Sequence, residues 1–176
     1  MIYVTSLAML DRTMRSIQPS RLVTLLPADE YVETPEGLPG EHHLRLGMHD
    51  ITEVIPGMTA PGPSHVEELI AFIRNWDDAV RRGEAEPRIV FHCRMRISRS
   101  GAAAYIALCM LSEAGQEADI AQAMRALGAH IQPNQLIVQI ADELLGREGR
   151  MAEAIDALGP GSGLNLMDWL ELTPPR

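Results

Sequence analysis

Short hydrophobic runs predominate in the first half of the chain, and longer segments with helical spacing predominate in the second half. The short runs predict four buried strands, at residues 2–7, 21–26, 43–46 and 88–91. Helical spacing predicts helices over residues 11–17, 64–82, 100–112, 117–127, 133–145 and 150–158. Strands separated by helices favour an α/β fold, with a central, mostly parallel sheet of about four or five strands and helices packed against its faces.

Segments rich in turn-forming residues separate these elements. Residues 27–40 combine prolines and glycines with four acidic residues, and we expect an exposed loop there. A second loop is expected over residues 55–63, and Ser64 with Glu67 three residues later predicts a capping box at the start of the next helix. A glycine-rich tail that ends in prolines completes the chain.

Length and composition indicate one globular domain. The 176 residues are 46% hydrophobic and 22% charged, which is enough to bury a sizeable core. We expect a single domain over residues 1–176, with its core at about 2–146 and a C-terminal helix and tail at 147–176. The formal net charge of -9 argues against nucleic acid or a membrane surface as a partner, because both favour basic proteins.

The cysteine content and the N-terminus indicate a cytoplasmic protein. Cys93 and Cys109 are too few for a disulfide framework, and the first residues lack the charged and then apolar profile of a signal peptide. No apolar run approaches the roughly 18–20 residues that a membrane span requires. We therefore expect a soluble protein in a reducing compartment, and we expect it to be a monomer.

The segment from residue 89 to residue 104 carries the clearest chemical pattern. A β-branched and aromatic run ends at His92 and Cys93, and an alanine-rich helix is expected after Ser100. The loop between them contains Arg94, Met95, Arg96, Ile97, Ser98 and Arg99. A strand, a loop and a helix N-terminus in this order surround a bound phosphate with backbone N–H groups and the positive end of the helix. A cysteine in that field should ionise easily.

This segment matches the H-C-x5-R-S signature, with His92-Cys93 followed by five residues and then Arg99-Ser100. It resembles the cysteine-dependent protein tyrosine and dual-specificity phosphatases, most of all the dual-specificity branch, of which compact members occur in bacteria. The resemblance covers roughly residues 2–146. It implies a three-layer phosphatase-like fold and the hydrolysis of phosphotyrosine in proteins, with phosphoserine and phosphothreonine as further candidates, through a phosphocysteine and without a metal or other cofactor.

The chemistry of phosphate esters assigns a role to each signature residue. Cys93 is the expected nucleophile, and the planar fork of Arg99 suits two phosphate oxygens at once. Backbone N–H groups of residues 94–99 are expected to hold the remaining oxygens, so phosphate or sulfate should bind there. His92 is expected to hold the loop and favour the thiolate, and Ser100 is placed to ease the departure of the Cys93 sulfur.

Two residues outside the signature complete the expected site. The segment around Asp50 follows a strand and precedes a loop and a helix, which resembles the place where the family keeps its general acid. Asp50 would then protonate the leaving group and later accept a proton from water; the alternative is a surface or capping carboxylate. Asn134, in Ile131-Gln132-Pro133-Asn134, resembles the Pro-Asn that opens a late helix in these enzymes and is expected to support the site.

Arg96 departs from the family pattern, which has glycine at the third position after the cysteine. A non-glycine residue at positive φ costs roughly 1–2 kcal/mol, which a fold can absorb. Arg96 could point outward and add positive potential at the mouth of the site. It could also distort the N–H cradle, and the protein would then be a catalytically weak or inactive module that binds phosphoproteins.

The same residues are compatible with other functions and sites. A phosphatase acting on a non-protein ester such as a phosphoinositide or nucleotide, an enzyme acting on arsenate, and a rhodanese-like sulfur transferase share the thiolate loop, although Arg99-Ser100 and Asp50 fit phosphate chemistry better. His42, His43, His49 and Asp50 are metal-ligating residue types close in sequence. However, His42 and His43 are adjacent and would point to opposite faces of a strand, so no metal site is predicted. Cys109 is expected to be a small core residue. The acidic loop after residue 28 could screen the pocket or be a solvated connection.

Overall fold

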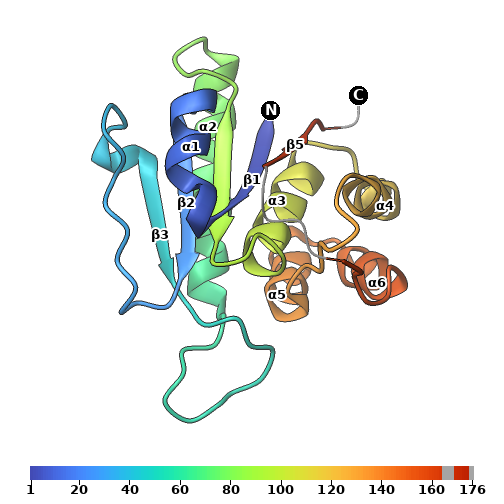
Figure 1. Cartoon of the computed structure of the whole chain (residues 1–176). Helices are drawn as coiled ribbons and strands as arrows, with labels where there is room; N and C mark the ends of the chain where they lie inside the picture. The colour runs from blue at the N-terminus through green and yellow to red at the C-terminus, as the bar shows by residue number, and fades with distance from the viewer. Residues whose placement is uncertain (164–168, 175–176) are drawn as a thin grey trace.

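The computed structural model describes residues 1–163 and 169–174 and contains one five-stranded sheet. The strands are β1 (Ile2–Ser6), β2 (Arg21–Leu26), β3 (His43–Gly47), β4 (Ile89–Cys93) and β5 (Leu170–Leu172). Their order in the sheet is β3-β2-β4-β1-β5, and only β5 is antiparallel to its neighbour. The carboxyl ends of β1 to β4 therefore meet at one edge of the sheet, the lower edge in Figure 1.

Helices fill most of the remaining described chain (Figure 1). The α-helices are α1 (Leu10–Ile17), α2 (Pro63–Arg81), α3 (Arg99–Met110), α4 (Glu117–Leu127), α5 (Gln135–Leu145) and α6 (Arg150–Ala157). Two short 3-10 turns are η1 (Leu7–Met9) and η2 (Gly40–His42). Within the described residues, no helix is both long and apolar enough to cross a bilayer.

The strands bury both faces, and this produces three layers. Along β4, Ile89 and Phe91 face the large core formed with α2 to α6, whereas Val90 faces a smaller core formed with α1. Successive side chains of a strand point to opposite faces, so a continuous apolar run is what a strand covered on both sides requires. The expected three-layer α/β fold with a mostly parallel sheet is confirmed.

Several boundaries differ from the sequence prediction, and two of them bear on the site and its neighbourhood. The fourth strand extends past residue 91, because His92 and Cys93 pair with Thr5 and Ser6 of β1. The helix α2 begins earlier, with Gly62 as its N-cap and Pro63 in its first turn, so the capping box at Ser64 and Glu67 was wrong. The ring of His65 accepts the Gly62 N–H at 3.1 Å in place of the expected serine cap.

The C-terminal tail contributes a strand, β5, to the sheet. Leu172 of β5 pairs with Ile2 at the edge of the sheet and is 2% exposed. A backbone edge next to β1 was available for pairing, which explains a strand that no local pattern announced. The remainder of the predicted tail, residues 164–168 and 175–176, lies outside the described residues.

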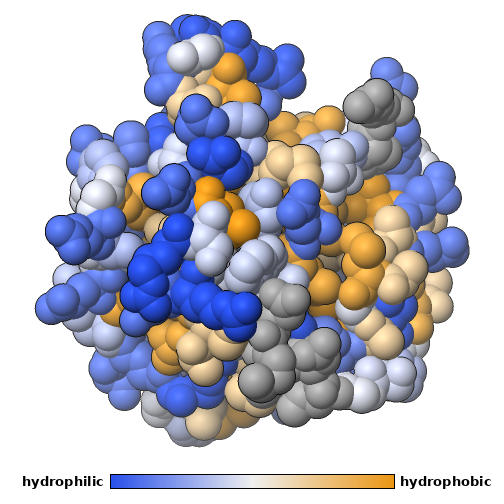
Figure 2. All heavy atoms as spheres, turned by 45° about the horizontal axis from the view of Figure 1, so that its top comes forward, coloured by the Kyte–Doolittle hydropathy of each residue, from blue (hydrophilic) through white to orange (hydrophobic). Residues whose placement is uncertain are grey.

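The surface differs between the two sides of the molecule. Figure 2 shows mainly hydrophilic atoms on the side of α1 and β3 and more hydrophobic surface on the side of α4 and β5. On the second side a groove of about 270 Å³ runs between α4 and β5. Leu127, which is 58% exposed, lies at its border. No residue of the cysteine loop lines this groove.

Candidate active site

The cysteine loop lies at the carboxyl edge of the sheet. β4 occupies the middle of the sheet and ends at Cys93, and α3 begins six residues later at Arg99. Cys93 is 2% exposed, and its Sγ lies 3.0 Å from the Oγ of Ser100 in the first turn of α3. The thiol therefore sits at the bottom of the loop, next to a helix N-terminus and a hydroxyl group.

Three backbone carbonyl groups of the loop accept hydrogen bonds from the surrounding protein. The carbonyl of Arg94 accepts the Leu7 N–H, that of Ile97 accepts the Gln132 N–H, and that of Ser98 accepts from Ala102 and Asn134. The N–H groups of residues 94, 95, 97 and 98 donate no backbone hydrogen bond to any described residue. Backbone N–H groups without a protein acceptor, next to a helix N-terminus, are the property of an anion-binding nest.

Arg99 is held beside this loop with donor capacity to spare. Its side chain is buried, and Nη1 donates to the carbonyl of Met48 at 2.8 Å. Its Nε makes no hydrogen bond within the described residues and lies 3.8 Å from Oδ2 of Asp50. A buried, unsatisfied guanidinium N–H is costly. Such a group points to a ligand that accepts hydrogen bonds.

Asp50 is brought to the loop from the far side of the sheet. It follows β3, and its Oδ1 accepts from the Ser98 hydroxyl at 2.6 Å and from the Asn134 amide at 3.0 Å. Its side chain remains 36% exposed. The loop that follows Asp50 is fixed at its base, because His49 and Thr59 are joined by two hydrogen bonds of 2.8 and 3.0 Å. The carboxylate is therefore fixed at the mouth and reachable from solvent.

Asn134 joins three parts of the site. It caps α5 by accepting the Ile137 N–H at 3.1 Å, and its amide donates to Asp50 and to the carbonyl of Ile51. Its own N–H donates to the carbonyl of Ser98 at 3.2 Å. Asn134, the residue expected to support the site, thus contacts the loop through its backbone N–H and the carboxylate through its side-chain amide.

His92 belongs to a buried chain of hydrogen bonds on the α1 face of the sheet. Its Nε2 lies 2.6 Å from Oγ1 of Thr24, which lies 2.7 Å from Nε2 of His43. The Nδ1 of His43 continues to Thr34 at 3.1 Å. Burial, followed by the neighbouring His43, lowers the pKa of His92 to about 3, and burial lowers the pKa of His43 to about 4. Both rings are neutral at physiological pH, so His92 supports the strand end without adding a positive charge.

Because both histidines are buried and neutral, we expect the protein to lose stability as the pH falls. Because each folded-state pKa lies below the usual value of about 6.5, the unfolded chain binds protons first as the pH falls. The two neutral rings contribute fully to the free energy of unfolding above pH 6.5. Below that pH the free energy of unfolding declines by up to about 1.4 kcal/mol per pH unit for each histidine. Urea unfolding between pH 7 and pH 5 measures the slope. His43→Gln should flatten it, and an equally steep slope in that variant would contradict the assignment.

The remaining loop residues divide into exposed and buried ones. Arg94 is exposed at the rim and forms an ion pair with Glu30 at 2.5 Å. The acidic loop therefore lies against the mouth and partly neutralises it. Met95 is 39% exposed. Arg96 is 1% exposed and has φ +60, so of the two alternatives for this residue the outward-pointing one does not hold.

Sequence reasoning missed several contributors. Thr24 and His43 support His92 through a chain of hydrogen bonds, and His130 contacts Arg96 of the loop. None of the three carries a motif, because these contacts arise only from the fold. The ring of His43, a metal-ligating residue type, bonds to Thr24 and Thr34. Within the described residues, no group of three or more His, Cys, Asp or Glu side chains is arranged to hold a metal ion. Cys109 is fully buried in α3, as expected of a core residue.

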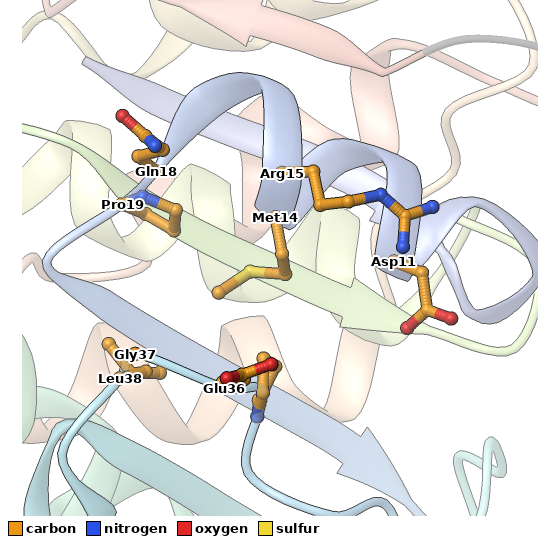
Figure 3. A pocket seen from close by; sticks show the side chains of 9 residues that line it. Asp11, Met14, Arg15, Gln18, Pro19, Glu36, Gly37 and Leu38 are labelled. Carbon is orange, nitrogen blue, oxygen red and sulfur yellow. The ribbon is translucent and has the colours of Figure 1, made fainter.

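A cleft of about 660 Å³ lies elsewhere, between α1 and residues 35–38. In Figure 3 the side chains of Asp11, Met14 and Arg15 project from α1, opposite Glu36 and Leu38 on the facing loop. None of residues 93–99 lines it. The cleft is thus separate from the cysteine loop.

Comparison with known proteins gives a structural match alone. The sequence matches no protein-family model and no curated protein. Crystal structures do match: that of DUSP15 has a TM-score of 0.58 at 19% identity and covers 89% of each chain. The Cydia pomonella PTP-2 phosphatase gives 0.55 at 13%, covering 81% of this chain and 84% of its own. PTPMT1 in complex with PI(5)P gives 0.54 at 15%, covering 88% and 89%. The chain has the fold of the dual-specificity and protein tyrosine phosphatases.

Proposed function

We propose that the protein hydrolyses phosphate monoesters through a phosphocysteine intermediate, with phosphotyrosine in proteins as its principal substrate. One observation carries the proposal: Arg99 is buried beside the cysteine loop with an Nε that makes no hydrogen bond within the described residues. A phosphate over Cys93 would satisfy that N–H together with the unbonded N–H groups of the loop. Three oxygens of a phosphoryl group match this donor set.

The first half of the reaction uses Cys93 and Asp50. The thiolate attacks phosphorus, so an S–P bond forms while the bond from phosphorus to the leaving oxygen breaks. Asp50 gives its proton to that oxygen. Oδ1 already accepts two hydrogen bonds, from Ser98 and Asn134, which leaves Oδ2 as the oxygen that carries the proton.

The second half returns the enzyme to its starting state. Asp50, now ionised, accepts a proton from a water molecule as that water attacks the phosphocysteine. The S–P bond breaks, and the Ser100 hydroxyl, 3.0 Å from Sγ, donates a hydrogen bond to the departing thiolate. Inorganic phosphate leaves. Two printed contacts support this sequence: Ser100 lies next to the sulfur of Cys93, and Asp50 is held by Ser98 and Asn134.

The depth of the nucleophile favours an aryl substrate. Cys93 is 2% exposed, so the phosphoryl group of a substrate has to reach past the rim of the site. The long side chain of phosphotyrosine reaches further than that of phosphoserine or phosphothreonine. Exposed apolar side chains also lie on the loops around the mouth: Met95 on the cysteine loop, and Val54 and Met58 on the loop after Asp50. An aromatic ring could pack against such groups.

The direct test is an assay on p-nitrophenyl phosphate with a chelator present. We expect phosphate release that does not depend on added metal and that tungstate inhibits competitively. We expect phosphotyrosine peptides to be turned over faster than phosphoserine peptides of the same sequence. Absence of turnover with retained tungstate binding would favour the second candidate, a phosphoprotein-binding module, for which the positive φ of Arg96 is the specific observation.

A further inference from the structure

Arg96 is the residue at which this loop departs from the family signature, and its conformation is unusual. Its backbone has φ +60, a region where glycine is at ease and a side chain is strained. Its own side chain is 1% exposed and is the largest fully buried one in the described chain. An arginine that is both strained and buried has to be held by specific contacts.

His130 supplies one of these contacts. The Nη2 of Arg96 lies 3.1 Å from Nε2 of His130, which is itself buried. Arginine only donates hydrogen bonds, so the neutral ring accepts through Nε2 and carries its proton on Nδ1. Burial, followed by the charge of Arg96, lowers the pKa of His130, which keeps the ring in the accepting form.

The segment that contains His130 also holds the rest of the loop. Two residues beyond it, the Gln132 N–H donates to the carbonyl of Ile97 at 3.1 Å, and the Asn134 N–H donates to the carbonyl of Ser98 at 3.2 Å. The Asn134 amide then reaches Asp50 at 3.0 Å. Arg96 thus ties the middle of the loop to the same segment that fixes its end and the carboxylate.

We propose that Arg96 is a positioning residue: its buried guanidinium, anchored on His130, holds the cysteine loop in the shape that receives a tetrahedral oxyanion. Glycine at this position would accept the same φ but also many others. The arginine replaces that freedom with a side-chain strut, so less ordering remains to be done when the anion binds. The proposal rests on the proposed function for its kinetic readout, but not for its binding readout.

The first test compares Arg96→Gly with the wild type. We expect the KM for p-nitrophenyl phosphate and the Kd for tungstate, measured by calorimetry, each to rise by about tenfold, because the loop must be ordered on binding. We expect kcat to change by less than about threefold, since no reacting group is removed. Unchanged or tighter tungstate binding, or a higher kcat/KM, would overturn the proposal and identify Arg96 as an obstruction.

The second test addresses the anchor and remains valid if the glycine variant folds poorly. His130→Gln keeps an acceptor close to the position of Nε2, and we expect KM and Kd within about threefold of the wild type. His130→Ala removes the acceptor, and we expect its KM and Kd to resemble those of Arg96→Gly. Equal effects of the two His130 variants would contradict the anchoring role. Tungstate binding without turnover in the wild type would defeat the proposed function alone, since Kd still tests Arg96.

Discussion

Cys93→Ser is expected to abolish turnover of aryl phosphates, with a loss in kcat of at least about 10⁴-fold. A serine hydroxyl stays protonated at neutral pH and is a far weaker nucleophile than a thiolate. The substitution leaves the loop backbone, Arg99 and the contact position of Ser100 in place. The variant should therefore still bind tungstate while releasing no phosphate, which separates loss of chemistry from loss of the site.

Cys109→Ala provides the matched control. Cys109 is fully buried within α3, and burial raises the pKa of its thiol to about 12. Such a thiol is a poor nucleophile. We expect this variant to keep wild-type kcat/KM, with a modest decrease in thermal stability from the lost core volume. Phosphate release by Cys93→Ser at a rate close to that of the wild type would eliminate the phosphocysteine mechanism.

Asp50→Asn is expected to give the second largest effect, a decrease in kcat of about 100-fold. The asparagine amide can keep the contacts to Ser98 and Asn134 through its oxygen, but it carries no transferable proton. The decrease should depend on the leaving group. Phenyl phosphate, whose leaving oxygen needs protonation, should lose far more activity than p-nitrophenyl phosphate, whose leaving group is stable as an anion. An equal loss for both substrates would argue against general acid catalysis.

Glu53→Gln is the control for that variant, because Glu53 is an exposed carboxylate three residues later in the same loop. It should leave kcat unchanged. Ser98→Ala removes the hydroxyl that lies 2.6 Å from Asp50 without removing the acid. We expect an intermediate decrease that retains the wild-type dependence on the leaving group, since the proton is still available but its donor is held less firmly.

Most of the fold follows from local patterns. The bounds of β2 and α4 agree with the prediction, because their hydrophobic runs end at clear breakers. The end of β4 was less clear, since polar His92 and Cys93 remain in the strand through pairing with β1. β5 was missed because a run of three residues is too short to indicate a strand, and it joins the sheet only where the β1 edge is free.

The candidate site divides in the same way. The signature from Cys93 to Ser100 is contiguous, so its order of strand, loop and helix could be inferred from local sequence. Asp50 was found by resemblance, but its contacts span 48 residues to Ser98 and 84 residues to Asn134. The partners of His92 on β2 and β3 carried no signal, because strand neighbours depend on sheet order.

Arg96 was predicted in part from local sequence and in part was decided by the tertiary structure. Its position in the loop, and the strain that follows from a side chain at positive φ, could be read from the residue type and its place in the signature. The direction of its side chain could not be inferred, because the local sequence is the same whether the arginine points to solvent or into the protein. Packing of the segment around His130 against the loop decided that it turns inward. Local sequence determines which backbone shapes are available, whereas contacts between distant segments select one of them.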